Sequence, residues 1–362
     1  MNINIRLLKV EEVNSVNEVY NKAYGNIRPL ESFKWEFING PWGKAIYVIA
    51  EDLDKDGNQI IGTQSAIPMI MINGVGEKVL TAKSEDTFVH PDYRGHKLFD
   101  RMYELLFEEC RKAGINYLWG FTYARKPFLK LGFSIPFDTI QGLYIIRPMA
   151  ASHYLSALNP SNSIKDKFKI FALTSTGYLN RLIHNFAGRP RKKNVVGKDF
   201  RIKTSLIDSQ LKKDNTLWSI HQTNEYLDWR LKHNPFPNDY LQFTGYSEKN
   251  ELDSAVLFNY RKEGFAYIEE INFSDPEKTK TIRELIASAI EFSEKERRPF
   301  LLRFWGFDVN ITTKLEMTLL KKLGFVFVKK GTAFVWKDLT SGNGLIAPEN
   351  VLLSRLLTQG NK

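Results

Sequence analysis

A basic loop at residues 93–97 is the stretch of this sequence with the clearest capacity for chemistry. It reads Tyr-Arg-Gly-His-Lys and lies between a strand-like segment ending near Val89 and a run of helical periodicity that starts at Leu98. A helix N-terminus carries unpaired backbone amides and a partial positive charge, so it favours an anion. The spacing therefore predicts a phosphate-sized loop held between a strand and a helix, with an ordinary exposed turn as the alternative.

The elements on either side must hold this loop in place. Apolar residues recur at helical spacing after it, and Gly114 is a plausible residue to end the helix. The residues expected on the buried helix face are Leu98, Met102, Leu105, Leu106 and Cys110. Cys110 is the single cysteine, so we expect a core position for it and neither a disulfide nor a cysteine-based metal site. His90 and His96 have no second ligand group near them in sequence, so we expect no metal.

Length and composition indicate a globular protein with two domains. The chain has 362 residues, of which 43% are hydrophobic and 25% charged. No segment approaches the ~18 continuous apolar residues of a membrane-spanning helix, and the N-terminus does not read as a secretory signal, so we expect a cytoplasmic protein. The net charge of +10 is concentrated in residues 151–200, where nine Lys/Arg face two Asp/Glu.

The order of predicted elements indicates a mixed α/β (α+β) fold with a mostly antiparallel sheet and one crossover. In the first 150 residues we expect strands at 3–8, 45–51, 59–72, 78–89, 117–121 and 140–147, and helices at 11–24, 28–38 and 98–113. Pro68 suggests a bulge or a break in its strand.

Beyond residue 150 the pattern changes and then returns. Residues 152–163 read as polar and turn-rich, 164–186 as a helix interrupted near Gly177, and 188–193 as a basic loop. From residue 201 a second αβ pattern follows, with helices at 215–232, 280–296 and 313–323, strands at 240–247, 254–261, 265–273 and 300–306, and a final hairpin at 325–337. Both halves contain Lys-Leu-Gly-Phe, at 130–133 and 322–325, which suggests a weak internal repeat.

Residues 45–147 resemble the core of the GCN5-related N-acetyltransferase (GNAT) superfamily. The resemblance is carried by VHPDYRGHKLF at 89–99 and FLKLGF at 128–133. Residues 201–338 resemble a degenerate second copy. The resemblance implies an acyl-CoA-binding domain at 1–150, a basic, partly helical connection at 151–200, a degenerate domain at 201–338 and a tail at 339–362. The segments at 35–41 and 226–235 are similar to bacterial tandem members associated with surface-polysaccharide loci.

The resemblance also implies which residues meet the co-substrate acetyl-CoA (acyl-CoA). The family's pyrophosphate loop begins in register at Arg94, and Lys97 and Phe99 stand where Gly and Gly/Ala are usual. The expected contacts are Arg94, Gly95, His96, Lys97, Leu98 and Phe99. Backbone groups of Phe88 and Val89 would pair with the pantetheine arm as an added strand.

The catalytic residues implied by the resemblance are a carboxylate and a tyrosine. Family members often use a carboxylate on the strand before the loop, which here is Glu85 or Asp86. Neighbouring strand residues point to opposite faces, so at most one of the two faces the cleft; a solvated or ion-paired carboxylate is the alternative. Pro127 and Phe128 replace the usual tyrosine acid. Tyr123 is the nearest substitute, with a structural or substrate-lining role as the alternative.

The resemblance implies N-acetyl transfer to a small primary amine, with an amino sugar or a sugar nucleotide as candidate acceptors and no metal. Two other functions remain open: an inactive GNAT-like binding scaffold, and aminoacyl transfer from charged tRNA, which would explain the basic middle of the chain. No aromatic residues interleave with the basic loop, so nucleic acid is not the expected partner. A homodimer is left open.

Overall fold

The computed structural model describes residues 2–25, 27–55, 59–158, 163–186, 195–201, 203–247, 249–307, 309, 311–340, 342 and 344–358. The basic loop expected at 188–193 lies outside these residues. Within the described part of the chain, none of the helices has both the length and the apolar composition needed to cross a bilayer.

The first half of the chain alternates helices with strands of one sheet. Its strands are β1 (Ile3–Leu7), β2 (Ile46–Asp52), β3 (Gln59–Asn73), β4 (Lys78–Val89), β5 (Tyr117–Thr122) and β6 (Ser134–Ile145). Its helices are α1 (Val13–Tyr24), α2 (Leu30–Phe33) continued by a π-helical turn (Lys34–Ile38), α3 (Leu98–Lys112) and α4 (Arg125–Lys130). The strand, loop and helix expected around residue 95 are therefore confirmed.

The second half begins with two helices, α5 (Pro148–Ala157) and α6 (Ile164–Phe186). Its strands are β7 (Val195–Gly197), β8 (Trp218–Ile220), β9 (Asp239–Tyr246), β10 (Leu252–Tyr260), β11 (Phe265–Phe273), β12 (Leu301–Phe307), β13 (Val326–Asp338) and β14 (Val351–Leu352). Its other helices are α7 (Thr204–Lys213), α8 (Asn224–Leu227) with a π-helical turn (Asp228–Lys232), α9 (Thr279–Phe292) with a π-helical turn (Ser293–Arg297), α10 (Ile311–Lys321) and α11 (Arg355–Thr358).

All fourteen of these strands join one sheet that runs through the whole molecule. The main order is β1-β2-β3-β4-β5-β13-β6-β12-β11-β10-β9-β7. Neighbours are antiparallel except β4 with β5, β11 with β12, and the short pair β14 with β8. The expected mixed, mostly antiparallel α+β architecture is confirmed. Each half has one parallel pair bridged by a helix, α3 in the first half and α9 in the second.

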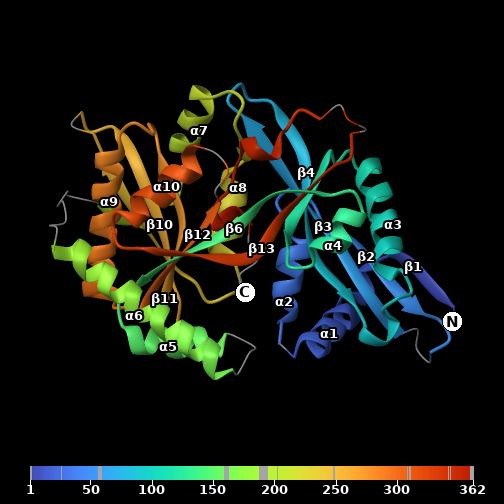
Figure 1. Ribbon diagram of the computed structural model, residues 1–362. Coiled ribbons are helices and arrows are strands. Elements are labelled where there is room, and N and C mark those ends of the chain that lie inside the picture. The colour runs from blue at the N-terminus through green and yellow to red at the C-terminus, as the bar shows by residue number, and fades with distance from the viewer. Residues whose placement is uncertain are drawn as a thin grey trace.

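The centre of the sheet is an exchange of strands between the two halves (Figure 1). Strand β13, from near the C-terminus, lies between β5 and β6, pairing with β5 over Ala333–Asp338. Strand β6, from the first half, pairs on its other edge with β12. Each half therefore contributes a strand to the sheet of the other half.

The hairpin expected at 325–337 is wrong, because β13 is one long strand with a bulge. Lys329 pairs with Ile140 and Ala333 with Asp138, so residues 330–332 lie opposite Thr139 alone. Gly331 adopts φ +87° there, a conformation that glycine reaches without strain. The turn signal at Lys330-Gly331 therefore marks a bulge, which bends the strand from one half toward the other.

Four further local expectations are corrected. Helix α5 includes residues 152–157 of the segment expected to be turn-rich at 152–163, and Trp218–Ile220 is a strand within the segment expected to be helical at 215–232. Gly177 does not interrupt α6; a Cβ on it would lie 2.6 Å from Cγ1 of Ile145, so the glycine lets the helix pack close to the sheet. Pro68 pairs in register with Ala82 and lies between the parts of β3 paired with β2 and with β8.

A reciprocal tryptophan pair joins the two halves away from the exchanged strands. The rings of Trp35 and Trp229 stack with centroids 4.5 Å apart and an interplanar angle of 14°. Nε1 of Trp35 donates to the carbonyl of Trp229 at 2.9 Å, and Nε1 of Trp229 donates to the carbonyl of Trp35 at 3.0 Å. Both residues lie on π-helical turns, so equivalent parts of a repeated unit meet face to face, as across a two-fold axis.

We expect the two halves to unfold as one cooperative unit, because the part of the sheet in each half is incomplete without a strand of the other half. Differential scanning calorimetry should give a single transition whose van't Hoff and calorimetric enthalpies agree. Two resolved transitions, each with its own enthalpy, would show that the exchanged strands do not couple the halves.

Candidate active site

A cleft opens in the first half where β4 and β5 stop pairing. The two strands pair in parallel only over Thr81–Lys83 with Tyr117–Trp119, whereas β4 continues along β3 as far as Val89. The resulting space has a volume of about 1510 Å³ and is bordered by α1, the far end of β4, the start of α3 and the segment that leads into α4. It therefore lies at the carboxyl end of a parallel strand pair and beside a helix N-terminus.

A bulge in β4 shapes the wall of this cleft. Ser65 pairs with Glu85 and Thr63 with Phe88, so the two residues between them, Asp86 and Thr87, lie opposite a single residue of β3. Asp86 adopts φ +56°, which is unfavourable for a residue with a Cβ. The hydroxyl of Thr63 donates to the Asp86 carbonyl at 2.7 Å and helps hold this conformation.

The Asp86 carboxylate is fixed by a buried ion pair. Nη1 and Nη2 of Arg28 donate to its two oxygens at 2.9 and 3.1 Å, and the Tyr47 hydroxyl donates to Oδ2 at 2.5 Å. The guanidinium also donates through Nε to Asn17 at 2.7 Å and lies 3.8 Å from the centre of the Tyr20 ring. Burial and the neighbouring carboxylate raise the pKa of Tyr47 well above its usual value, so its hydroxyl stays a donor.

Of the two neighbouring carboxylates, Glu85 and Asp86, Glu85 is the accessible one. Its side chain is 32% exposed, whereas the side chain of Asp86 is 2% exposed. The Glu85 carboxylate forms an ion pair with the ammonium of Lys83, and both Glu85 and Asp86 border the cleft. A substrate in the cleft can therefore reach the Glu85 carboxylate directly, while Asp86 is enclosed by its partners.

Tyr123 and Phe128 have different environments. Tyr123 follows β5, borders the cleft and is 72% exposed, so its hydroxyl is accessible. Phe128 on α4 is 5% exposed and packs against the rings of Phe99, Tyr103 and Phe133. The position expected for a tyrosine acid thus holds a core side chain that has no hydroxyl.

The loop before α3 presents backbone amides toward one end of the cleft. The first hydrogen bond of the helix runs from the Arg101 amide to the Lys97 carbonyl, so the amides of Leu98, Phe99 and Asp100 precede the hydrogen-bonded turns. Gly95 has φ +92° and open space where a Cβ would stand. These features suit an anion approaching the backbone at the positive end of a fifteen-residue helix.

The side chains of this loop divide into two groups. Arg94, His96 and Lys97 are exposed, and Arg94 borders the cleft, whereas Leu98 is 1% exposed in the core beneath α3. Leu98 can therefore offer an anion only its amide. Lys97 is the residue before the helix and adopts φ +56°, the conformation for which glycine is favoured. Phe88 and Val89, on β4, also line the cleft.

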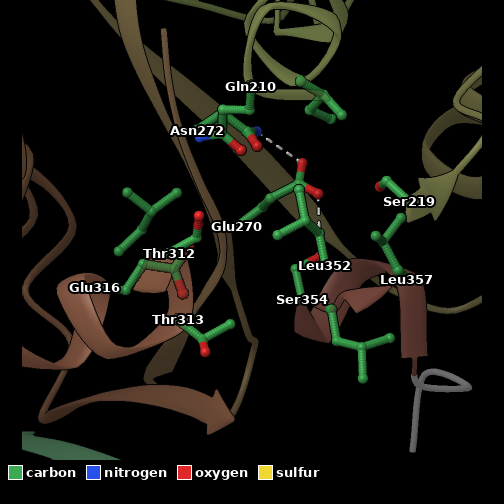
Figure 2. Close-up of a pocket in the computed structure, with 13 residues that line it drawn as sticks. Gln210, Ser219, Glu270, Asn272, Thr312, Thr313, Glu316, Leu352, Ser354 and Leu357 are labelled. Carbon is green, nitrogen blue, oxygen red and sulfur yellow. Dashed lines mark hydrogen bonds between the residues drawn. The ribbon is translucent and has the colours of Figure 1, made fainter. Parts of the chain in front are cut away.

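In the second half, the place beyond the parallel pair is filled (Figure 2). Strands β11 and β12 pair over Phe265–Ile268 with Leu301–Phe304, and Glu269 and Glu270 follow. Glu270 accepts from Asn272 at 3.0 Å and from Ser354 at 3.0 Å, and it forms a buried ion pair with Lys203. The remaining cavity is about 20 Å³, room for roughly one water molecule.

The C-terminal segment supplies most of this filling. Leu352, Leu353 and Leu357 line the small cavity, and the Arg355 guanidinium forms a buried ion pair with Glu269. Burial and the nearby Glu270 raise the pKa of Glu316 well above its usual value, which favours the protonated form of this carboxyl. The loop before α9 reads Ser-Asp-Pro-Glu-Lys over 274–278, without glycine and with two acids, so it lacks the features of an anion site.

Sequence reasoning missed Arg28 and Tyr47, the residues that hold Asp86 in place. Their only sequence signal is a single arginine at the start of a predicted helix and a tyrosine within an apolar strand, and both are too common to indicate a site. Cys110 is buried beneath α3 as expected, and burial raises the pKa of its thiol to about 12. Among the described residues, no group of three His, Cys, Asp or Glu side chains could hold a metal ion.

Comparison with known proteins gives a family match within the first half of the chain. Residues 4–135 match the family model described as "Acetyltransferase (GNAT) domain". No curated protein sequence matches the chain.

Solved structures share the fold of nearly the whole chain. A probable N-acyltransferase from Enterococcus faecalis V583 is 12% identical, with a TM-score of 0.60 over 94% of this chain and 73% of its own. A GCN5-related N-acetyltransferase from Anabaena variabilis is 10% identical, with a TM-score of 0.59 over 94% and 74%. Saccharomyces cerevisiae N-myristoyltransferase with bound myristoyl-CoA is 13% identical, with a TM-score of 0.57 over 93% and 79%.

Removing one partner of the buried ion pair should destabilise the protein strongly. We expect Arg28→Met or Asp86→Asn to lower the free energy of unfolding by about 3 kcal/mol or more, because each leaves a buried polar group without its partner. The free energy of unfolding of the double variant should fall by less than the sum of the decreases in the two single variants. Urea unfolding measures this, with Arg111→Met on the exposed face of α3 as a control expected to change little. If the losses of stability in the two single variants added up in the double variant, Arg28 and Asp86 would not be energetically coupled.

Replacing Lys97 by glycine should stabilise the fold. The positive φ of Lys97 costs roughly 1 kcal/mol relative to glycine, and Lys97→Gly removes that cost. Lys97→Ala keeps the Cβ and should give no such gain, which makes it the matched control. Equal urea midpoints for the glycine and alanine variants would argue against backbone strain at this position.

Proposed function

Since residues 4–135 match the acetyltransferase (GNAT) domain model, we propose that this chain is an acyl-CoA-dependent N-acyltransferase that acylates a small primary amine. The observation that supports this most is the position of the cleft. It joins the free edge of β4, an accessible carboxylate and the amide-rich start of α3 in one continuous space. A nucleotide-linked thioester needs these three things together: a place for its phosphates, a path for its arm and a group beside its carbonyl.

The residues present fit an acyl-CoA. The pyrophosphate would lie against the amides of Leu98, Phe99 and Asp100, with Arg94 and Lys97 supplying positive charge. The pantetheine arm would run along Phe88 and Val89. Beyond Lys83, no strand of the described chain pairs with the β4 edge that faces β5, so that edge can accept an added strand. The bound thioester supplies the acyl group to be transferred.

The chain's own residues would handle the protons of the transfer. The amine nitrogen attacks the thioester carbonyl, a C–N bond forms, and the C–S bond breaks to release the thiolate. Glu85 accepts the proton that the amine loses, and Tyr123 donates a proton to the sulfur, so charge and atoms balance. Asp86 positions the bulge through Arg28 and Tyr47 and does not take part in the transfer.

The acceptor end of the cleft is aromatic, which supports an amino sugar or a sugar nucleotide as the substrate. Tyr24 on α1 is 48% exposed and Tyr123 is 72% exposed, and both line the cleft. Exposed aromatic rings with polar tips suit the mixed apolar and hydroxylated faces of a sugar. The acyl group that we propose is transferred is acetyl.

A catalytically inactive binding scaffold is the second candidate. The observation that favours it is the buried Phe128, which stands where the family's tyrosine acid is usual and cannot donate a proton. In that case the cleft would bind coenzyme A without turnover, and Tyr123 would only line it.

We expect acetyl-CoA to bind with a stoichiometry of one per chain, as measured by isothermal titration calorimetry. Arg94→Ala should weaken this binding by roughly tenfold, because a charge-assisted contact to a phosphate is lost. Arg111→Ala, on the exposed last turn of α3, is the matched control. Absence of binding at high micromolar acetyl-CoA would overturn the proposal.

Glu85→Gln should lower turnover of an amino-sugar panel by roughly 100-fold while leaving acetyl-CoA affinity unchanged, because the amide cannot accept the proton. Release of free thiol measures the rate, and Glu104→Gln on the exposed face of α3 is the control. Binding of acetyl-CoA without any thiol release in the wild type would favour the scaffold. Equal rates for Glu85→Gln and the wild type would remove Glu85 from the mechanism.

A further inference from the structure

Helix α6 exposes a continuous apolar face. Five large side chains on it are exposed at between 54% and 86%, namely Ile164, Phe168, Phe171, Leu179 and Ile183. Their intervals of four, three, eight and four residues place them on one side of the helix. Exposed apolar residues are normally scattered singly, so a row of five along one helix indicates a surface that is covered by something else.

The opposite face of α6 fixes the helix to the protein. Gly177 lies against Ile145 and Val326, and Thr174 is fully buried. Leu173 and Tyr178 pack with the cluster beneath β6 and β12. The apolar row therefore points outward because the inner face is already occupied, and turning the helix would break that packing.

Helix α5 extends the same surface. The helices α5 and α6 pack against each other and lie on the opposite side of the molecule from α3 (Figure 1). Met149 on α5 and Leu158, the residue after α5, are exposed at 81% and 55%. The apolar row on α6 therefore lies beside a second helix whose two ends also carry exposed apolar side chains.

The charges around the row are positive. Lys165, Lys167 and Lys169 are exposed, and residues 148–186 contain four Lys/Arg and one Asp/Glu. On a helix, residues 165 and 167 fall on opposite flanks of the row that passes through Ile164 and Phe168. Lysines in such flanking positions can extend their ammonium groups toward phosphates while the apolar side chains enter a less polar layer.

We propose that the outer face of α5 and α6 docks on an anionic lipid surface, with α6 lying in the plane of the membrane interface. The row of apolar side chains would enter the boundary between headgroups and acyl chains, and the three lysines would meet lipid phosphates. A second copy of this chain is less well matched, because two such faces would bring their lysines together. This inference is independent of the acyl transfer proposed above.

Vesicle co-sedimentation of the full chain tests the proposal. The wild type should bind vesicles of phosphatidylcholine with phosphatidylglycerol, and added salt should weaken the binding. Phe168→Ser with Phe171→Ser should weaken it by roughly tenfold or more, since each side chain carries a large apolar area. The control, Val75→Ser with Leu129→Ser, removes residues exposed at 69% and 53% elsewhere and should change nothing.

Changing charge alone separates the two contributions. Lys165→Gln, Lys167→Gln and Lys169→Gln together should weaken binding to the anionic vesicles by roughly tenfold or more and leave binding to pure phosphatidylcholine unchanged. Circular dichroism and thermal unfolding confirm that each variant is folded.

Three outcomes would overturn the proposal. The first is a wild type that does not bind anionic vesicles. The second is an equal loss of vesicle binding in the phenylalanine variant and in its control. The third is a wild-type dimer in light scattering that becomes a monomer in the phenylalanine variant, without vesicle binding by either. That last result would assign the face to contact between copies of this chain.

Discussion

The exchange of β6 and β13 is the constraint on which the rest of this molecule depends. Each strand completes the sheet of the other half, and the bulge opposite Thr139 lets β13 pass from one half into the other. The reciprocal pair of Trp35 and Trp229 joins the halves a second time. The walls of the cleft are consequently set by both halves, since Trp305, Thr332 and Val335 border it from the second.

The two halves share an architecture but use it differently. In the first, the space beyond the parallel pair is open and faces a glycine-containing basic loop; in the second, the same space holds paired carboxylates, a lysine and the C-terminal segment. Leu353, Leu356 and Leu357 of that segment belong to the hydrophobic cluster that also contains Trp35 and Trp229. The first half keeps its opening at the cost of a buried ion pair and a strained residue, Asp86, beside the cleft.

Local patterns predicted the elements well, including the whole of β4, α3 and β5 and the loop between them. The place of β13 could not be predicted, because apolar periodicity shows that a segment is a strand and not which strand it pairs with. The role of Arg28 was hidden for a similar reason: its partners Asp86 and Tyr47 come near it only in the folded chain. The exposed row on α6 is present in the sequence, but periodicity alone cannot tell an outward apolar face from a buried one.

The position of β13 also sets the order in which this protein can be made. Ser134 and Trp336 are hydrogen-bonded neighbours although 202 residues separate them. While the ribosome is still synthesising the second half, β5 and β6 have already emerged with the edges that β13 will cover, and those edges can pair wrongly with other chains. The first half therefore cannot complete its sheet until β13 has been translated.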